Sequence, residues 1–134
     1  MPIRRYQYGQ GAYLLLHNCD EQIVTATIYG IVSIDTMACM RADVIECTGD
    51  RCIVSDLSHC IITSTAAEID TIYGMTQASG SRDRSCAWVV TPEGARPWRT
   101  LAARMAYLGY ARRVFTSLPA ALVWVRREAA LPHF

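Results

Sequence analysis

The chain has 134 residues, of which 51% are hydrophobic and 19% charged, and its formal net charge is +1. This length supports one hydrophobic core and is short for two, so we expect a single domain over residues 1–134. The balanced charge argues against a strongly basic nucleic-acid-binding protein, and the absence of lysine excludes catalysis through a lysine Schiff base.

The charges are distributed unevenly along the chain. Residues 1–83 contain five Arg and ten Asp or Glu, a net charge of −5, whereas residues 84–134 contain eight Arg and two Glu, a net charge of +6. A dipolar surface of this kind suits docking to a charged protein partner or head-to-tail self-association. A chance arrangement of helix faces explains the asymmetry equally well.

The first third of the sequence predicts β-structure. Residues 1–10 are interpreted as an N-terminal arm or a short edge strand. The runs 11–17 and 22–32 predict two strands of a hairpin, joined by a turn at 18–21. The second run alternates and is rich in β-branched residues, which is typical of a half-buried strand.

A helix is predicted next, because Ser33 can serve as its N-cap and Gly49 as its stop. Its apolar face is formed by residues at helical spacing, namely Met37, Met40, Val44 and Cys47. Residues 52–57 then predict a short buried strand that leads into a loop.

Ser64 or Thr65 can cap a second helix that ends near Gly74 and is followed by a polar loop. Residues 87–90 form a continuous apolar run, which is typical of a strand that is covered on both faces.

The C-terminal third predicts a helix, a strand and a final helix. Thr91 caps the first helix and Gly109 ends it, and its apolar stripe comprises Trp98, Leu101, Met105 and Leu108. Residues 114–115 predict a short strand. Ser117 caps the last helix, which has Pro119 just inside it and a buried stripe of Leu118, Ala121, Leu122 and Val125.

The resulting order is ββαβαβαβα. Strands that alternate with helices predict an α/β fold with a mixed, mostly parallel sheet, right-handed crossovers, an N-terminal hairpin and about four helices.

The six cysteines, at positions 19, 39, 47, 52, 60 and 86, form no C-x-x-C pair, so we expect buried small hydrophobic residues. The N-terminus lacks an apolar signal core, and no apolar run approaches the length of a membrane span. These features predict a cytoplasmic protein with no integral membrane segment.

Three segments together resemble the STAS-like, or SpoIIAA-like, domains, whose relatives include bacterial anti-sigma-factor antagonists. They are CIVSDLS at 52–58, CAWVV at 86–90 and RVFTSLPAALVWV at 113–125. The resemblance implies a SpoIIAA-like fold and a non-enzymatic regulatory function through a protein partner.

The resemblance also implies a region for the partner site. In the antagonists a partner kinase phosphorylates a serine at the start of the second helix, and the matching stretch here carries Ser64 and Thr65. The Asp that precedes the family's serine and the Gly that follows it are absent, so any phospho-switch is degenerate. Together with Ser58, these hydroxyls are the candidate phosphorylation and partner site; a plain N-cap role is the alternative.

A second interpretation is a small apolar ligand or lipid bound in a crevice formed by Trp98, Arg99 and Tyr107. The adjacent residues His59 and Cys60 do not predict a catalytic pair or a metal site, because neighbours in an extended segment point to opposite faces. No hydrolase or phosphate-loop motif is present, so the sequence predicts no enzyme, no cofactor and no catalytic residue. A homodimer is expected from the edge strand at 3–17 and the split charge.

Overall fold

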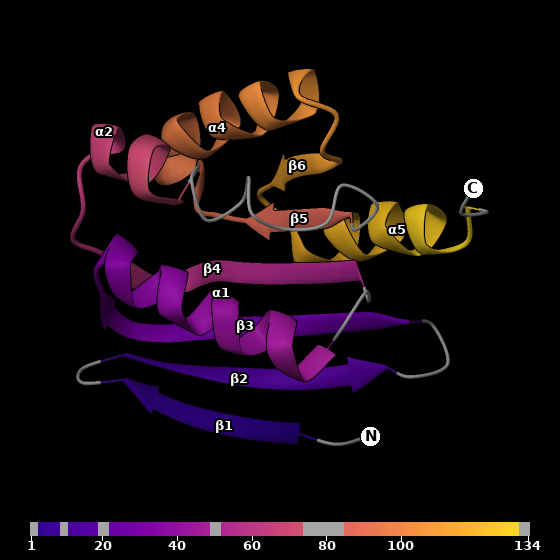
Figure 1. Cartoon of the computed structure of the whole chain (residues 1–134), viewed down its shortest axis with the longest axis horizontal. Coiled ribbons are helices and arrows are strands. Elements are labelled where there is room, and N and C mark those ends of the chain that lie inside the picture. Colours follow the sequence, from indigo (N-terminus) through magenta and orange to yellow (C-terminus); the bar gives the residue numbers. More distant parts are fainter. Residues whose placement is uncertain (1–2, 9–10, 19–21, 49–51, 74–84, 132–134) are drawn as a thin grey trace.

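The computed structural model of the chain describes residues 3–8, 11–18, 22–48, 52–73 and 85–131. In the described part, six strands form one sheet in the order β1-β2-β3-β4-β5-β6 (Figure 1). The strands are β1 (Ile3–Tyr8), β2 (Gly11–Asn18), β3 (Ile23–Val32), β4 (Cys52–Ile62), β5 (Cys86–Val89) and β6 (Arg112–Phe115). Strands β1 to β3 pair antiparallel, and β3 to β6 pair parallel.

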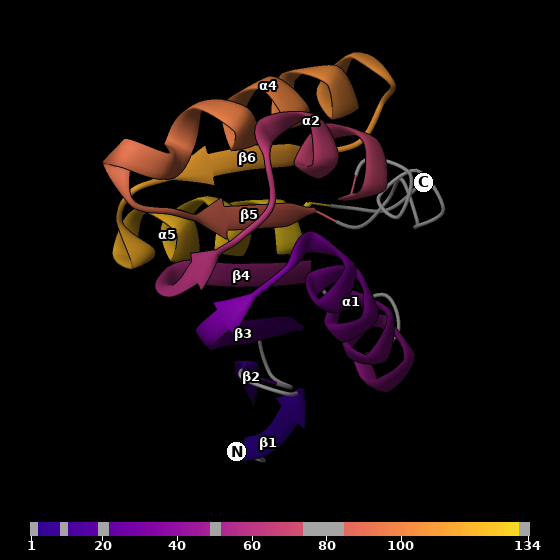
Figure 2. The same ribbon diagram turned by 90° about the vertical axis from the view of Figure 1, so that its left-hand side faces the viewer.

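Helices cover both faces of the sheet (Figures 1 and 2). They are α1 (Ile34–Thr48), α2 (Ala66–Glu68) with its continuation η1 (Ile69–Tyr73), η2 (Pro92–Gly94), α4 (Ala95–Tyr107) and α5 (Leu118–Ala129). The helices α1, α2 and α4 lie within the three parallel crossovers. Because such crossovers share one hand, they pack on the same face, and α5 packs on the other.

The larger core lies between the sheet and the three crossover helices. Its centre is Trp88 of β5 against Trp98 of α4, both 1% exposed, with ring centroids 5.3 Å apart in an edge-on arrangement. The smaller core lies under α5, where Ala121 and Val125 pack on Val54 and Ala87. The sheet is therefore a middle layer buried on both sides along β4 and β5.

The α/β class, the mixed sheet and the helical faces are confirmed. Met37, Met40 and Val44 are buried on α1, and Leu101 and Met105 on α4. Ser117 accepts a hydrogen bond from the backbone N–H of Ala120, as expected of an N-cap, and Gly109 has φ +92 at the end of α4. The predicted stops or loops at Gly49, Gly74 and 77–84, and the side chain of Cys47, lie outside the described residues.

The prediction that the chain enters a loop after Leu57 is wrong. Strand β4 continues to Ile62, because the second half of β3 offers it a parallel partner as far as Val32. A strand whose partner is provided by a distant segment cannot be bounded from its own residues.

Two smaller expectations on α4 are also wrong. Thr91 precedes the 3₁₀ turn η2 and makes no side-chain capping bond, so α4 begins only at Ala95. Leu108 is 45% exposed, because it is the C-cap and has already left the apolar stripe.

We predict that Gly11→Ala destabilises the fold. Gly11 pairs with Gly30 across β2 and β3, and a Cβ at this position would overlap Cγ1 of Val32 and lie 3.5 Å from Cε of Met40. Overpacking of this kind costs about 1–3 kcal/mol in free energy of unfolding, measurable by urea denaturation. Gly94→Ala is the matched control, since its Cβ would meet only the Thr91 hydroxyl at 3.3 Å. A Gly11→Ala protein as stable as the parent would contradict the prediction.

Candidate functional site

Strand β4 extends beyond β5 at its carboxyl end, where it stays paired with β3. Strand β4 pairs with β5 only from Ile53 to Asp56, but it pairs with β3 as far as Ile62. Helix α5 packs on the opposite, amino-terminal half of β3 and β4, around Ile23 and Cys52. The two strands therefore form a ribbon, residues 29–32 with 59–62, that helix α5 leaves uncovered.

A β-bulge at the base of this ribbon is built around Asp56. The register moves from Thr27 opposite Asp56 to Tyr29 opposite His59, so two residues of β4 face one of β3. The carboxylate of Asp56 is buried, and its Oδ1 accepts the backbone N–H of Ser58 at 3.0 Å and the Ser58 hydroxyl at 2.5 Å. This local turn satisfies the N–H of Ser58, which the bulge removes from regular strand pairing.

The uncovered face of the ribbon carries apolar and aromatic side chains. Tyr29 is stacked on His59 with centroids 5.6 Å apart, and Ile31 lies opposite Ile61 in the register. Tyr29, Ile31 and Ile61 are 43%, 46% and 65% exposed, and they are three of the seven exposed large hydrophobic residues in the described chain. His59 Nε2 also lies 3.6 Å from Oδ2 of Asp56. We call Tyr29, Ile31, His59 and Ile61 the ribbon patch.

The segment after the ribbon is held against the start of α1. The backbone N–H of Thr63 donates to the carbonyl of Val32 at 2.9 Å. The Ser64 hydroxyl accepts the backbone N–H of Ile34, the first residue of α1, at 2.8 Å. Ser64 thereby satisfies one of the N–H groups that a helix leaves free at its N-terminus.

Thr65 is the N-cap of α2 and forms a capping box with Glu68. Its hydroxyl accepts the N–H of Glu68 at 3.2 Å, and a Glu68 carboxylate oxygen accepts the N–H of Thr65 at 3.0 Å. These hydrogen bonds from the Thr65 backbone and side chain lower the pKa of Glu68.

The structure thus gathers Ser58, Ser64 and Thr65 into one segment that joins β4 to α2. Each hydroxyl already makes an intramolecular hydrogen bond. The Ser58 hydroxyl donates to Asp56, the Ser64 hydroxyl accepts from the backbone N–H of Ile34, and the Thr65 hydroxyl accepts from the backbone N–H of Glu68. The three side chains have structural contacts whatever further function they have.

An open cavity of about 240 Å³ lies beside this segment, next to the C-terminal half of β4 and beyond the carboxyl end of β5. Its walls come from β4, the start of α2 and η1, and the approach to α4. They comprise Leu57, Cys60, Ile62, Ser64, Ala66, Ile69, Val90, Thr91, Gly94, Pro97 and Trp98.

Cys60 faces this cavity, whereas His59 belongs to the ribbon patch on the other side of β4. Burial, with a smaller effect from the charge of Asp56, raises the pKa of the Cys60 thiol to about 11. The thiol donates to the carbonyl of Leu57 at 3.3 Å and stays protonated at neutral pH. The two neighbours do not form a nucleophilic pair, in agreement with the alternation of strand side chains.

The predicted crevice of Trp98, Arg99 and Tyr107 is not formed. Trp98 is buried in the core, whereas Arg99 is exposed and Tyr107 is 92% exposed. The structure therefore brings Trp98 together with the segment at Ser64 and leaves the other two residues on the outer surface of α4.

The arginines of the C-terminal half are spread over several environments. Arg104 pairs with Asp70 of η1 at 3.2 Å, and Arg112 is buried with its guanidinium 5.3 Å from the ring centroid of Tyr110. Arg113 lies over Phe115 on the face of α5. These positions do not converge on one anion site within the described residues.

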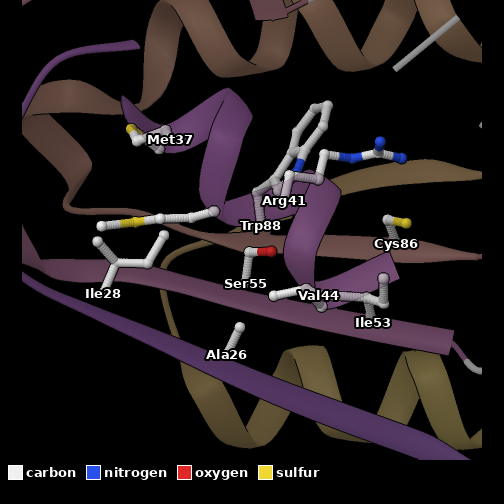
Figure 3. Close-up of a pocket in the computed structure, with 10 residues that line it drawn as sticks. Ala26, Ile28, Met37, Arg41, Val44, Ile53, Ser55, Cys86 and Trp88 are labelled. Carbon is white, nitrogen blue, oxygen red and sulfur yellow. The ribbon is translucent and has the colours of Figure 1, made fainter. Parts of the chain in front are cut away.

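A second, much smaller cavity lies between α1 and the sheet (Figure 3). Its volume is about 20 Å³, enough for a single water molecule. Met37, Arg41 and Val44 of α1 line it together with Ser55 of β4 and Trp88 of β5. It is a packing defect of the larger core and too small for a ligand.

Among the described residues, no group of three or more His, Cys, Asp or Glu side chains is arranged to hold a metal ion. None of the helices described is long and apolar enough to cross a lipid bilayer.

Sequence reasoning missed the bulge, the ribbon patch and the cavity. The sequence did contain a signal for the bulge, because an Asp side chain typically accepts a hydrogen bond from the backbone two residues later, and Ser58 follows Asp56 at this spacing. The other two depend on which segments pair and pack, which no local pattern reveals.

Comparison with known proteins identifies the fold. Neither a scan against protein-family models nor a search of curated proteins finds a match. Among solved structures, the crystal structure of an anti-sigma factor antagonist from Mycobacterium paratuberculosis is similar, with a TM-score of 0.62. The match covers 87% of this chain and 94% of that chain at 15% sequence identity. The chain therefore has the fold of an anti-sigma factor antagonist, as the sequence resemblance implied, and identity this low shows the fold alone.

We predict that the capping box stabilises the protein only while Glu68 is ionised. Because the folded state lowers the pKa of Glu68, its contribution is present above the unfolded value of about 4.3 and is lost as the pH falls through the lower, folded value. The difference in melting temperature between the parent and Glu68→Ala should therefore be present at neutral pH and shrink in acid. Glu93→Ala, which removes an exposed glutamate from η2, is the control. A Glu68→Ala difference that is constant with pH would refute the role of the charge.

Proposed function

We propose that this chain is a cytoplasmic, non-enzymatic regulatory domain that acts by binding a protein partner, in the manner of an anti-sigma factor antagonist. The observation that carries the proposal is the ribbon patch, a group of exposed apolar side chains that runs directly into the segment 63–68. The similarity in fold supports it, but a fold by itself does not specify a function.

The chemistry of the surface suits a protein partner. Tyr29 and His59 provide flat rings, and Ile31 and Ile61 provide aliphatic contact area, which are the kinds of group that dominate protein interfaces. The patch is formed on paired strands, so its side chains are held in place before binding. Such preorganisation reduces the entropy lost on association.

Ser64 is the better of the two hydroxyls for a phospho-switch. A phosphate there would lie at the N-terminus of α1, where the N–H of Ile34 and the positive end of the helix dipole favour negative charge. At Thr65 it would face the carboxylate of Glu68, which lies 3.0 Å from the Thr65 hydroxyl. Ser64 is half-buried, so a kinase would reach it only after the segment opens.

The proposal predicts that Ile61→Ser weakens binding to the anti-sigma kinase of the host by about tenfold or more, because it removes an exposed contact side chain from the patch. Val123→Ser on α5 is the matched control, since Val123 is a similar side chain that is 55% exposed far from the patch. Calorimetry with the purified kinase measures both. Equal affinities for the two variants would contradict the assignment of the surface.

The same kinase, supplied with ATP, tests the switch. Peptide mass spectrometry should then find phosphate on Ser64 and not on Thr65, and Ser64→Asp should bind the kinase more weakly than Ser64→Ala. An unmodified protein after this treatment would remove the switch and leave the partner-binding proposal intact.

We also propose that the chain forms a homodimer through β1. This strand is at the edge of the sheet and pairs only with β2 within the described residues, so its outer side is open to a second copy. Sedimentation velocity over a concentration series should show a dimer at high concentration. A monomer throughout the series would refute the proposal.

A further inference from the structure

The open cavity of about 240 Å³ supports an inference about ligand binding that goes beyond partner binding. It lies beside the C-terminal half of β4 and beyond the carboxyl end of β5, between the start of α2 and the approach to α4. In open sheets with parallel strands, ligands bind in the crevice at the carboxyl ends of the strands. The cavity is separate from the ribbon patch, because Cys60 and Ile62 face it whereas His59 and Ile61 point to the opposite side of β4.

The floor of the cavity is apolar. Leu57, Ile69, Val90 and Trp98 line it, and each is between 1% and 4% exposed. No Arg, Asp or Glu side chain of the described chain lines the cavity. A charged ligand would lose its hydration here without compensation, so the walls select a neutral molecule.

Two hydroxyls provide polarity at the rim. The Ser64 hydroxyl accepts the N–H of Ile34, and its own proton has no acceptor among the described residues. The Thr91 hydroxyl makes no capping bond, and Gly94 leaves the space beside it open. Both groups can donate to an oxygen atom of a ligand. The Cys60 thiol, in contrast, already donates to Leu57.

The volume sets the size of the ligand. At about 30 Å³ per molecule of liquid water, 240 Å³ is the space of about eight waters. An apolar cavity of about 150 Å³ is known to hold benzene, so this one has room for a ring and a few substituent atoms. It is smaller than the usual range of about 300–1,000 Å³ for drug-sized ligands.

We propose that this cavity is a binding site for a small neutral molecule with one ring and one hydrogen-bonding oxygen. The ring would lie on the apolar floor beside Trp98, and the oxygen would accept from Ser64 or Thr91. The other candidate occupant is an apolar side chain of the protein partner, and the experiment below separates the two.

The test is a titration of the ¹⁵N-labelled protein with p-cresol, followed by NMR of the tryptophan indole signals. We expect a saturable shift of the Trp98 signal with no shift of Trp124, which lies under α5 on the other face of the sheet. Benzoate and benzylamine, which are the same size but charged, should give no saturable shift at the same concentrations.

Substitutions in and beside the cavity wall test whether p-cresol binds in the cavity. Ala66→Phe should weaken p-cresol binding by about tenfold or more, because Ala66 lines the cavity at its mouth. Ala67→Phe is the matched control, since Ala67 is the next exposed residue of α2 and does not line the cavity. Thr91→Val should weaken binding by about threefold to tenfold, through the loss of one hydrogen bond.

An absent Trp98 shift, equal shifts at Trp98 and Trp124, or equal binding by Ala66→Phe and Ala67→Phe would overturn the proposal. The proposal would also be overturned if p-cresol did not bind the parent protein and if Ala66→Phe, unlike Ala67→Phe, no longer bound the kinase. The cavity would then hold a side chain of the partner. The outcome is independent of the ribbon patch, since Ile61→Ser should retain full p-cresol binding.

Discussion

The parallel pairing of β3 with β4 is the constraint on which the rest of the structure depends. It runs from Ile23 opposite Cys52 to Val32 opposite Ile62, whereas β5 and β6 contribute only four residues each. Because β4 extends beyond β5 while it stays paired with β3, it forms the ribbon and leaves open space beside β4 where β5 has ended. Both strands also finish next to α1, and the hydrogen bond from the N–H of Ile34 to the Ser64 hydroxyl joins the two exits. The long strand pair thus positions the ribbon patch and the β4 side of the cavity.

The bulge at Asp56 decides which residues of the ribbon are exposed. Before it, even-numbered residues of β4 such as Cys52 and Val54 face α5, and odd-numbered ones such as Ile53 face the larger core. One extra residue reverses this alternation, so that Ile61 is exposed and Cys60 packs against the larger core. The buried carboxylate of Asp56 stabilises the reversal by accepting two hydrogen bonds from Ser58. The Asp-Leu-Ser pattern at 56–58, which resembles the central strand of the antagonists, therefore stabilises the bulge, and Ser58 takes part through its two hydrogen bonds to Asp56.

Local patterns predicted the helices, because caps and apolar stripes act within a few residues. Ser117 and Gly109 are examples, since each completes hydrogen bonding or geometry at a helix end. The full length of β4, the bulge and the cavity arise from segments that are distant in the sequence, as in the bond between Ile34 and Ser64. The crevice at Trp98 and Tyr107 was a different kind of error. These residues are nine positions apart, which at about 3.6 residues per turn places them on opposite sides of a helix, so the sequence alone could have excluded it.

The cavity and the ribbon patch lie on opposite sides of one short connection, residues 63–66. This connection leads into α2, which has three helical residues, none of them buried, and continues as a π-type turn held by Ile69. Single π turns occur frequently at functional sites, and a segment with so few buried contacts is among the least stable of a fold. If both proposed sites are occupied in turn, a ligand that fixed Ser64 and Ala66 from the cavity side would also fix the surface presented to a partner at Thr65. By thermodynamic reciprocity, a partner that fixed this connection would then change the affinity of the cavity by the same factor. Such coupling would need no phosphate on Ser64 or Thr65.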